Sequence, residues 1–196
     1  MPPFKTVPGI DDQVYAADRE SWRAWLEANA GTRDSIWLVS YKKATGKTTV
    51  PYEDAVEEAL CFGWVDSKVQ SMDHERYRQY YSRRKPTGLW NGANKKRVAR
   101  LIKQGKMTEA GLRAVEVAKE NGAWEFLDEV EALVVPKDLA EALGQHKGAR
   151  QTYEDFGNSA KQGILLWVKQ AKRPETRAKR IAQTAEAAAR GVKPIG

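Results

Sequence analysis

The chain divides into two stretches with different secondary-structure patterns, and this division limits the folds open to it. In the first stretch, a strand pattern at residues 36–41 precedes a helix pattern that begins at Pro51 and ends at Gly63. Beyond residue 106 only helix patterns remain, separated by Pro, Gly and Asn. We therefore expect a helix-rich α+β fold. Residues 1–106 would form an α+β part and residues 107–196 a helical part packed against it, or the two would make one continuous domain.

A β-hairpin is the second feature of the first stretch. Residues 64–70 and 76–83 have the composition of strands, and the polar residues between them can turn the chain. Together with residues 36–43, they predict a small three-stranded sheet with a helix laid on it. The spacing of apolar residues further predicts six largely buried positions: Trp22, Trp25, Trp37, Leu60, Trp167 and Val168.

The composition is that of a globular protein. At 196 residues, with 41% apolar residues, the chain is long enough to bury a core. Its single cysteine, Cys61, has apolar neighbours and is expected to be an inert core residue. His74 and His146 lack the spacing of metal ligands, so we expect no bound metal and no cofactor. The N-terminus lacks a signal-peptide core and no apolar run approaches the roughly 20 residues that span a bilayer, which predicts a cytoplasmic protein.

Charged residues are strongly segregated along the chain. Residues 76–106 contain eleven Lys or Arg and no Asp or Glu, with Tyr77, Tyr80, Tyr81 and Trp90 among them. Such a segment predicts a basic face for an anionic ligand, an acidic partner or nucleic acid. The alternative is that these charges pair with acidic residues of segments 1–75 and 107–160. No RNP, KH, helix-turn-helix or zinc-finger pattern supports nucleic acid in particular.

Trp64, Asp66 and Lys68 form a second candidate group. At strand spacing they share one face, where an aromatic ring, a carboxylate and an amine could line a ligand pocket. The alternative is a cross-strand ion pair between Asp66 and an arginine of the neighbouring strand.

Arg173, Arg177 and Arg180 form a third group, at the entrance to the last helix. Their spacing of four and three residues places them on one helical stripe, beside free backbone N–H groups that attract anions. The alternative is a solvated face, or pairing with the acidic helices of the middle region.

Arg83, Arg84 and Lys85 are expected at a strand end near the helix that begins at Asn91, an arrangement that binds phosphate or carboxylate. No nucleophile and base pair and no phosphate-binding glycine loop is present, so we predict no catalytic residues. The predicted ligand-binding residues are Trp64, Asp66, Lys68, Arg83, Arg84, Lys85, Trp90, Asn94, Lys96, Arg173, Arg177 and Arg180.

Several short motifs in fixed order resemble one family. They include residues 25–29, residues 36–43, the run from Ala59 to Ser67, residues 105–111 and residues 171–177. Over about residues 4–194, the chain resembles the bacterial YdeI/OmpD-associated family, whose members are labelled bacteriocin-protection proteins. Where that family would have Trp-Ser at a helix entrance, this chain has Trp90-Asn91, and both Ser and Asn can cap a helix. That family has no agreed catalytic residues, so the resemblance carries none over to this chain.

These observations predict a non-enzymatic cytoplasmic protein. In this interpretation it is a stress or antimicrobial-resistance accessory protein that binds an anionic small molecule or an acidic partner through a basic face. The alternatives are a nucleic-acid-binding protein and an enzyme acting on a phosphorylated or carboxylated small molecule. The sequence does not decide the oligomeric state or the identity of the ligand.

Overall fold

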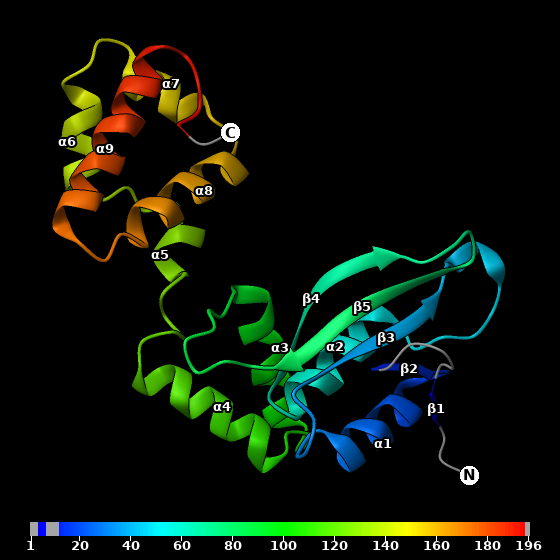
Figure 1. The fold of residues 1–196 in the computed structure, drawn as a ribbon. Coiled ribbons are helices and arrows are strands. Elements are labelled where there is room, and N and C mark those ends of the chain that lie inside the picture. Colours follow the sequence, from blue (N-terminus) through cyan, green and yellow to red (C-terminus); the bar gives the residue numbers. More distant parts are fainter. Residues whose placement is uncertain (1–3, 7–11, 195–196) are drawn as a thin grey trace. The chain divides into compact units, whose positions relative to one another are not determined.

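The computed structural model describes residues 4–6 and 12–194, and its contacts divide the chain into two units (Figure 1). Unit 1 is Met1–Glu125 and unit 2 is Phe126–Gly196. The boundary therefore lies 19 residues beyond the predicted one at residue 106. The reason is that the helix following residue 106 packs against unit 1, as described below.

Unit 1 contains a five-stranded sheet and four α-helices among its described residues. Its elements are β1 (Phe4–Thr6), β2 (Gln13–Ala16), α1 (Arg19–Asn29), β3 (Ser35–Tyr41), a 3-10 turn (Lys43–Thr45), α2 (Tyr52–Cys61), β4 (Trp64–Ser71), β5 (Arg76–Arg83), α3 (Gly92–Lys103) and α4 (Glu109–Glu120). Unit 2 contains α5 (Asp128–Glu131), α6 (Lys137–Gly144), α7 (Ala149–Asp155), α8 (Asn158–Lys169) and α9 (Pro174–Ala189). The fold is mixed α and β and rich in helix, as predicted.

The strand order is β1-β2-β3-β5-β4. The predicted hairpin is present, because β4 and β5 pair antiparallel, and β5 also pairs antiparallel with β3. The prediction of three strands was wrong, since β2 pairs parallel with β3 and β1 pairs antiparallel with β2. These two strands have three and four residues, too few for an alternating pattern to stand out in the sequence.

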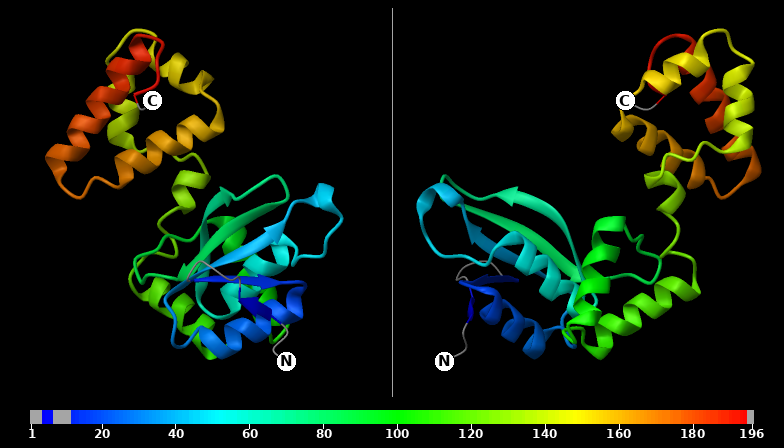
Figure 2. Two further views of the ribbon diagram at one scale, coloured as in Figure 1. Left: turned by 45° about the vertical axis from the view of Figure 1, so that its right-hand side comes forward. Right: turned by 180° about the vertical axis from the view of Figure 1, so that it is seen from behind.

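One face of the sheet packs against α1 and α2, which lie on the same side of it in both views of Figure 2. The Trp22 ring lies 5.3 Å from the Tyr81 ring, and the Trp25 ring lies 6.0 Å from the Trp64 ring. Ile36 and Leu38 belong to the same cluster of buried side chains. Trp22 and Trp25 are buried in this cluster as predicted, and Leu60 and Val168 are buried as predicted in two other clusters.

Trp37 and Trp167 are only half-buried, contrary to prediction. Trp37 pairs with Tyr80 in the register of β3 and β5, one residue out of phase with the buried Ile36 and Leu38, and so points to the opposite face of the sheet. Trp167, in unit 2, packs at the edge of the apolar cluster of that unit and lies 5.1 Å from the Arg180 guanidinium. The Trp37 ring likewise lies 4.4 Å from the Arg78 guanidinium, so both half-buried tryptophans lie beside an arginine.

Helix α4 approaches α2 closely because of a glycine. A Cβ added at Gly111 would lie 2.2 Å from the Cys61 carbonyl oxygen, so only glycine fits there without movement of the backbone. Thr108, the N-cap of α4, donates its hydroxyl to the same carbonyl at 2.7 Å. These contacts explain why α4 belongs to unit 1 and not to the helical unit 2.

Candidate functional site

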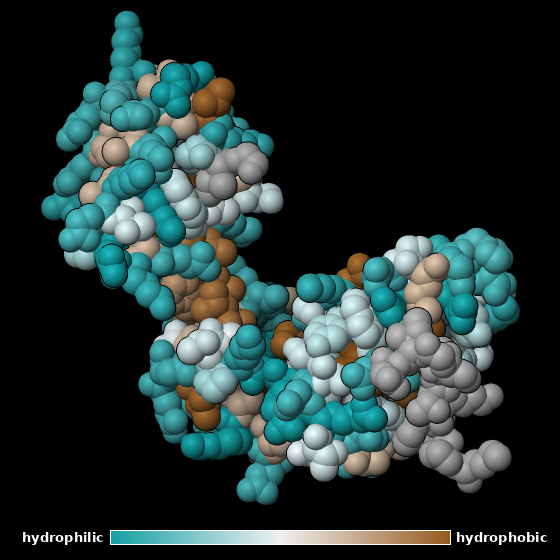
Figure 3. Space-filling model, viewed as in Figure 1, coloured by the Kyte–Doolittle hydropathy of each residue, from teal (hydrophilic) through white to brown (hydrophobic). Residues whose placement is uncertain are grey.

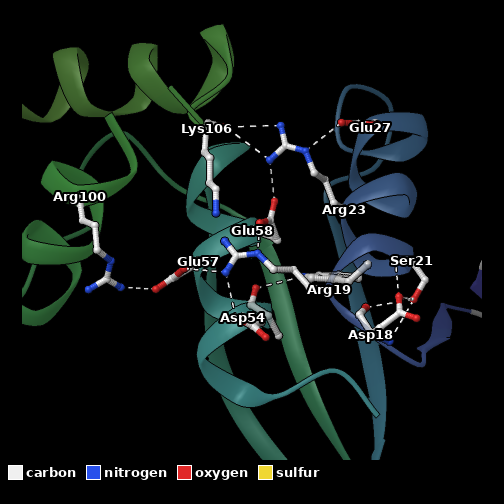
Figure 4. A network of polar contacts seen from close by, with 12 residues as sticks. Asp18, Arg19, Ser21, Arg23, Glu27, Asp54, Glu57, Glu58, Arg100 and Lys106 are labelled. Atoms are coloured by element: carbon white, nitrogen blue, oxygen red, sulfur yellow. Dashed lines mark hydrogen bonds and ion pairs between the residues drawn. The ribbon is translucent and has the colours of Figure 1, made fainter. Parts of the chain in front are cut away.

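Helix α2 carries a row of carboxylates that hold α1 and α3 beside it (Figure 4). Glu58, with a side chain only 2% exposed, accepts hydrogen bonds from Arg19 Nε at 2.6 Å and from Arg23 Nη1 at 2.7 Å. Glu57 is bound by Arg19, at 3.0 Å, and by Arg100. A buried carboxylate that is matched by two guanidinium groups is a structural element rather than a free acid or base.

The pKa values of this network follow from the same pairing. Burial raises the pKa of Glu57, but hydrogen bonds from Arg100 and Arg19 lower it by more, so the net shift is downward. Burial lowers the pKa of Arg19, but its bonds to Glu58 and Glu57 raise it overall. Burial, together with the charge of Glu58, raises the pKa of the nearby Cys61 thiol to about 11, so the thiol stays protonated at neutral pH, in agreement with its predicted inert role.

A pocket of about 370 Å³ lies beside this scaffold, within unit 1. Its walls come from the C-terminal ends of α1 and α2, from the end of β5 with the loop after it, and from α4. The lining is apolar and cationic, with one carboxylate: Leu26, Glu27, Ala30, Gly31, Phe62, Gly63, Arg83, Arg84, Lys85, Pro86, Ala110, Arg113, Ala114 and Val117. The volume lies in the range of small-molecule sites.

Arg84 differs from the other cations of this pocket in that its guanidinium is stacked on an aromatic ring and is partly enclosed. Its guanidinium carbon lies 3.7 Å from the centre of the Trp90 ring, and Nη1 donates to the Leu89 carbonyl at 3.0 Å. Its Nε and Nη2 are closed off from solvent and have no hydrogen-bond partner among the described residues. Burial lowers the pKa of Arg84 to about 10, and the charge of Asp66 only partly opposes this, so the side chain stays charged at neutral pH.

The stacking partner Trp90 is itself buried, at 1% exposure. Its Nε1 is a further buried donor without a partner among the described residues. Asn91, the next residue, caps α3 as predicted by accepting a hydrogen bond from the Asn94 backbone N–H at 2.8 Å. Arg84 therefore lies near the N-terminal end of α3, as predicted from the sequence.

The other cations of the pocket are less confined. Arg83 donates to the Ala30 and Arg33 carbonyls at 3.1 and 3.0 Å and lies 3.6 Å from Asp34, so it caps the end of α1. It is therefore directed to α1 and not to the α3 entrance predicted for it. Arg113 lies 3.4 Å from Glu116 on its own helix, and Lys85 is exposed. The single acidic lining residue, Glu27, is bound by Arg23 at 3.0 Å.

Trp64, Asp66 and Lys68 do not form the predicted site. Trp64 is fully buried in the core. Asp66 accepts from Gln79 Nε2 at 2.7 Å and from Tyr52 at 3.2 Å, so its partner is an amide rather than the arginine of the alternative. The register shifts between Asp66 and Val69, which places Lys68 in a bulge and breaks the alternation on which the shared face depended.

The remaining predicted residues of unit 1 lie on α3. Asn94 is buried, and its Oδ1 accepts from Arg97 at 3.0 Å, whereas Lys96 is exposed. Neither lines the pocket. Much of the basic segment is used within the unit: Arg76, Arg97 and Arg100 form ion pairs with Asp73, Glu53 and Glu57. The alternative of internal pairing thus accounts for a large part of the charge.

The three arginines of the last helix belong to unit 2. Arg177 pairs with Asp138 at 2.7 Å, as its alternative predicted, and this pairing raises the pKa of Arg177 and lowers that of Asp138. Arg180 lies over Trp167 and donates to the Trp167 carbonyl, while Arg173 is the exposed N-cap of α9. Arg177 and Arg180 therefore have different internal partners, and the three arginines do not act as one stripe.

Sequence reasoning missed Leu26, Phe62 and Arg113 as pocket residues. They come from three helices, and no sequence spacing connects them. The one available signal was Gly63 with Gly111, since paired glycines mark places where elements approach closely. Among the described residues there is no cluster of His, Cys, Asp or Glu that could hold a metal, and no described helix is long and apolar enough to cross a membrane.

Comparison with known families gives two matches along the chain. Residues 14–114, about half of the chain and most of unit 1, match a domain of unknown function, DUF8412. Residues 132–191, most of unit 2, match the bacteriocin-protection, YdeI or OmpD-associated family. No curated protein and no solved structure gives a significant match.

The second match confirms the family recognised in the sequence, over a narrower range than the resemblance across residues 4–194. The motifs at residues 25–111 fall instead in the region that matches the other family. The chain therefore belongs to the DUF8412 family through its first unit and carries a YdeI/OmpD-associated bacteriocin-protection domain in its second.

Proposed function

We propose that this chain is a non-enzymatic binding protein whose unit 1 pocket holds an anionic small molecule with an apolar body. The observation that carries the proposal is the charge of the pocket lining at Arg84 and Lys85, which have no carboxylate partner among the described residues. Trp90 holds the Arg84 guanidinium in the pocket wall. Two edge atoms of this guanidinium, Nε and Nη2, are enclosed without a hydrogen-bond partner, so its charge is only partly compensated within the protein.

The charge balance of the lining supports an anion. Arg83 and Arg113 lie near Asp34 and Glu116, and the lining residue Glu27 is bound to Arg23, but no carboxylate among the described residues pairs with Arg84 or Lys85. An unpaired, partly desolvated charge costs free energy that an anionic ligand would recover. The apolar lining from α1, α2 and α4 supports a ligand whose remaining part is hydrocarbon.

A binding role accords with the residue types present. The lining contains no His, Cys, Ser or Thr, and its one carboxylate is held by an arginine. The description of the second family as bacteriocin-protection proteins supports an accessory role but carries no information on a ligand. The proposed anion-binding site is therefore the unit 1 pocket and not the whole basic segment of residues 76–106.

Calorimetry with matched probes tests the proposal. The set would be benzoate, octanoate and 4-phenylbutyrate, each compared with the alcohol and the amine of the same skeleton. We expect at least one carboxylate to bind at millimolar concentration or better and its alcohol and amine to bind more weakly. We also expect Arg84→Gln to weaken carboxylate binding about tenfold or more, as is usual when a charged hydrogen bond is lost.

Arg150→Gln serves as the matched control, since it removes one exposed arginine from unit 2. Equal binding of the alcohol and the carboxylate, no binding by any carboxylate of the set, or full binding by Arg84→Gln would each contradict the proposal.

A further inference from the structure

A second feature, separate from the pocket, is the sheet face opposite α1 and α2. Strand register assigns residues to it, because paired residues of neighbouring strands point to the same side. The positions on this face are Gln13 and Tyr15 of β2, Trp37, Val39 and Tyr41 of β3, and Arg76, Arg78, Tyr80 and Ser82 of β5. They include four aromatic rings and two arginines and no acidic residue.

The side chains at the centre of this face form a layer of aromatic and cationic groups. The Trp37 and Tyr80 rings lie 5.0 Å apart at 62°, and the Arg78 guanidinium lies 4.4 Å from the centre of the Trp37 ring. Tyr15 and Tyr41 form a second pair, 5.6 Å apart. Val39 pairs with Tyr15 on one side and with Arg78 on the other, and it is buried at 2% exposure. The larger side chains around Val39 therefore make up the surface of this face.

These rings are half-buried, although apolar strand residues on the opposite face are fully buried. Arg78 donates to the Gln70 side chain at 2.6 and 2.9 Å, and no carboxylate neutralises it among the described residues. At the hairpin end of the face, Lys42 donates to Ser71 and to the Asp73 carbonyl, and Lys43 is exposed. The aromatic rings of this face therefore lie near positive charges that no carboxylate neutralises among the described residues.

The neighbouring acidic residues do not alter this balance. Asp73 is bound to Arg76 at 2.7 Å, and Glu75 is bound to Lys47 at 2.7 Å. Both carboxylates are thus already matched by a cation, whereas Arg78, Lys42 and Lys43 add net positive charge. A ligand for this face must supply both negative charge and flat apolar groups.

We propose that this sheet face binds single-stranded nucleic acid. Unpaired bases stack on exposed aromatic rings and on arginine planes, while phosphates interact with nearby Lys and Arg. Duplexes are less suitable, because their bases are stacked on one another and offer no face to a protein ring. An apolar partner or a lipid surface would not explain the positive charges of Arg78, Lys42 and Lys43, which no carboxylate neutralises among the described residues. The molecular surface visible in Figure 3 is largely hydrophilic.

Fluorescence anisotropy of the full chain with fluorescein-labelled dT15 and rU15 tests this inference. We expect binding that weakens with salt, by about 0.7 log units per log unit of salt for each phosphate contacted. Tyr80→Ala should weaken binding about tenfold, in the range usual for loss of one stacked base, and Tyr80→Phe should retain it. Arg78→Gln should weaken binding and reduce the salt slope.

Two controls separate this site from general charge and from the pocket. Lys103→Gln removes one exposed charge from α3, and Arg84→Gln disables the pocket, and neither should change oligonucleotide affinity by more than about twofold. Circular dichroism establishes that each variant is folded. The inference is wrong if dT15 and rU15 do not bind at low salt, or if a duplex binds as tightly as a single strand. It is also wrong if Tyr80→Ala binds dT15 as tightly as the parent does, in the way expected of heparin, a polyanion without bases.

Discussion

The Arg84 guanidinium lies 3.7 Å from the centre of the Trp90 ring, and this stacking holds a positive charge in the pocket wall while leaving one edge of the group unpaired. A cation over an indole face is attracted by the ring, which offsets part of the cost of burial. It does not supply hydrogen-bond acceptors to Nε and Nη2. The arrangement therefore favours an anionic ligand in the pocket, because its charge would balance that of the partly desolvated guanidinium.

Replacing Arg84 by methionine should separate its role in binding from its role in stability. Methionine retains packing against Trp90 and removes a partly desolvated charge, so the free energy of unfolding should stay unchanged or rise by up to about 1 kcal/mol. Carboxylate binding should be lost. Urea denaturation followed by tryptophan fluorescence measures the first effect and calorimetry the second. A loss of more than about 2 kcal/mol would mean that Arg84 is a structural residue.

Glu58→Gln should be strongly destabilising. It leaves the guanidinium groups of Arg19 and Arg23 without their shared carboxylate, at a site where the Glu58 side chain is 2% exposed. We expect a loss of about 2 to 3 kcal/mol, below the value for fully buried pairs because the arginines are partly exposed. Glu116→Gln, which removes an exposed partner of Arg113, is the control and should change stability by less than about 0.5 kcal/mol. Equal effects of the two changes in denaturation would show that the buried network contributes little.

Gly111→Ala should displace α4. The new Cβ would lie 2.2 Å from the Cys61 carbonyl oxygen, a backbone atom that cannot move by a side-chain rotation. We expect a loss of about 1 to 3 kcal/mol and weaker carboxylate binding, because α4 supplies a wall of the pocket. Gly163→Ala, in the middle of α8, meets nothing within 4 Å and should stabilise the protein by about 0.5 to 1 kcal/mol. Thermal denaturation of both variants measures the contrast.

Glu57 should contribute to acid sensitivity. Its pKa in the folded protein lies below the ordinary value of 4.5, through its bonds to Arg100 and Arg19. The unfolded chain therefore binds more protons in this range, so the contribution is fully present above about pH 4.5 and is lost as the pH falls through the lowered pKa. The stability difference between the parent and Glu57→Gln should shrink below pH 4.5, as measured by urea denaturation at a series of pH values. A difference that stayed constant down to pH 3 would exclude this linkage.

Cys61 should act as a reporter of unfolding. Its side chain is fully buried, and its pKa is raised to about 11, so both access and the thiolate fraction are low at pH 8. We expect no reaction with a thiol reagent in the native protein over minutes and complete reaction of one thiol in urea. Gly111→Ala should speed the native reaction, since it loosens α4 beside the Cys61 carbonyl. Rapid labelling of the native parent would mean that α2 is open to solvent at this point.

The sequence was a good guide wherever local patterns carry the information. Asn91 caps α3, and β3, β4 and β5 form one sheet. Capping and alternation depend on residues a few positions apart, so they can be recognised without knowledge of the fold. The short strands β1 and β2 escaped recognition because they depend on pairing with a distant partner.

The sequence by itself determined the mixed helix and strand content, the helical character of the second unit, the burial of Cys61 and the family of residues 132–191. Only the tertiary structure decided how the charges are used. Arg84 and Arg97 have the same formal charge in the same basic segment, yet Arg97 meets Glu53 while Arg84 lies over Trp90 with an unpaired edge. The physical reason is that pairing depends on distances of a few ångströms between residues that are far apart in the chain, and no sequence spacing encodes such distances.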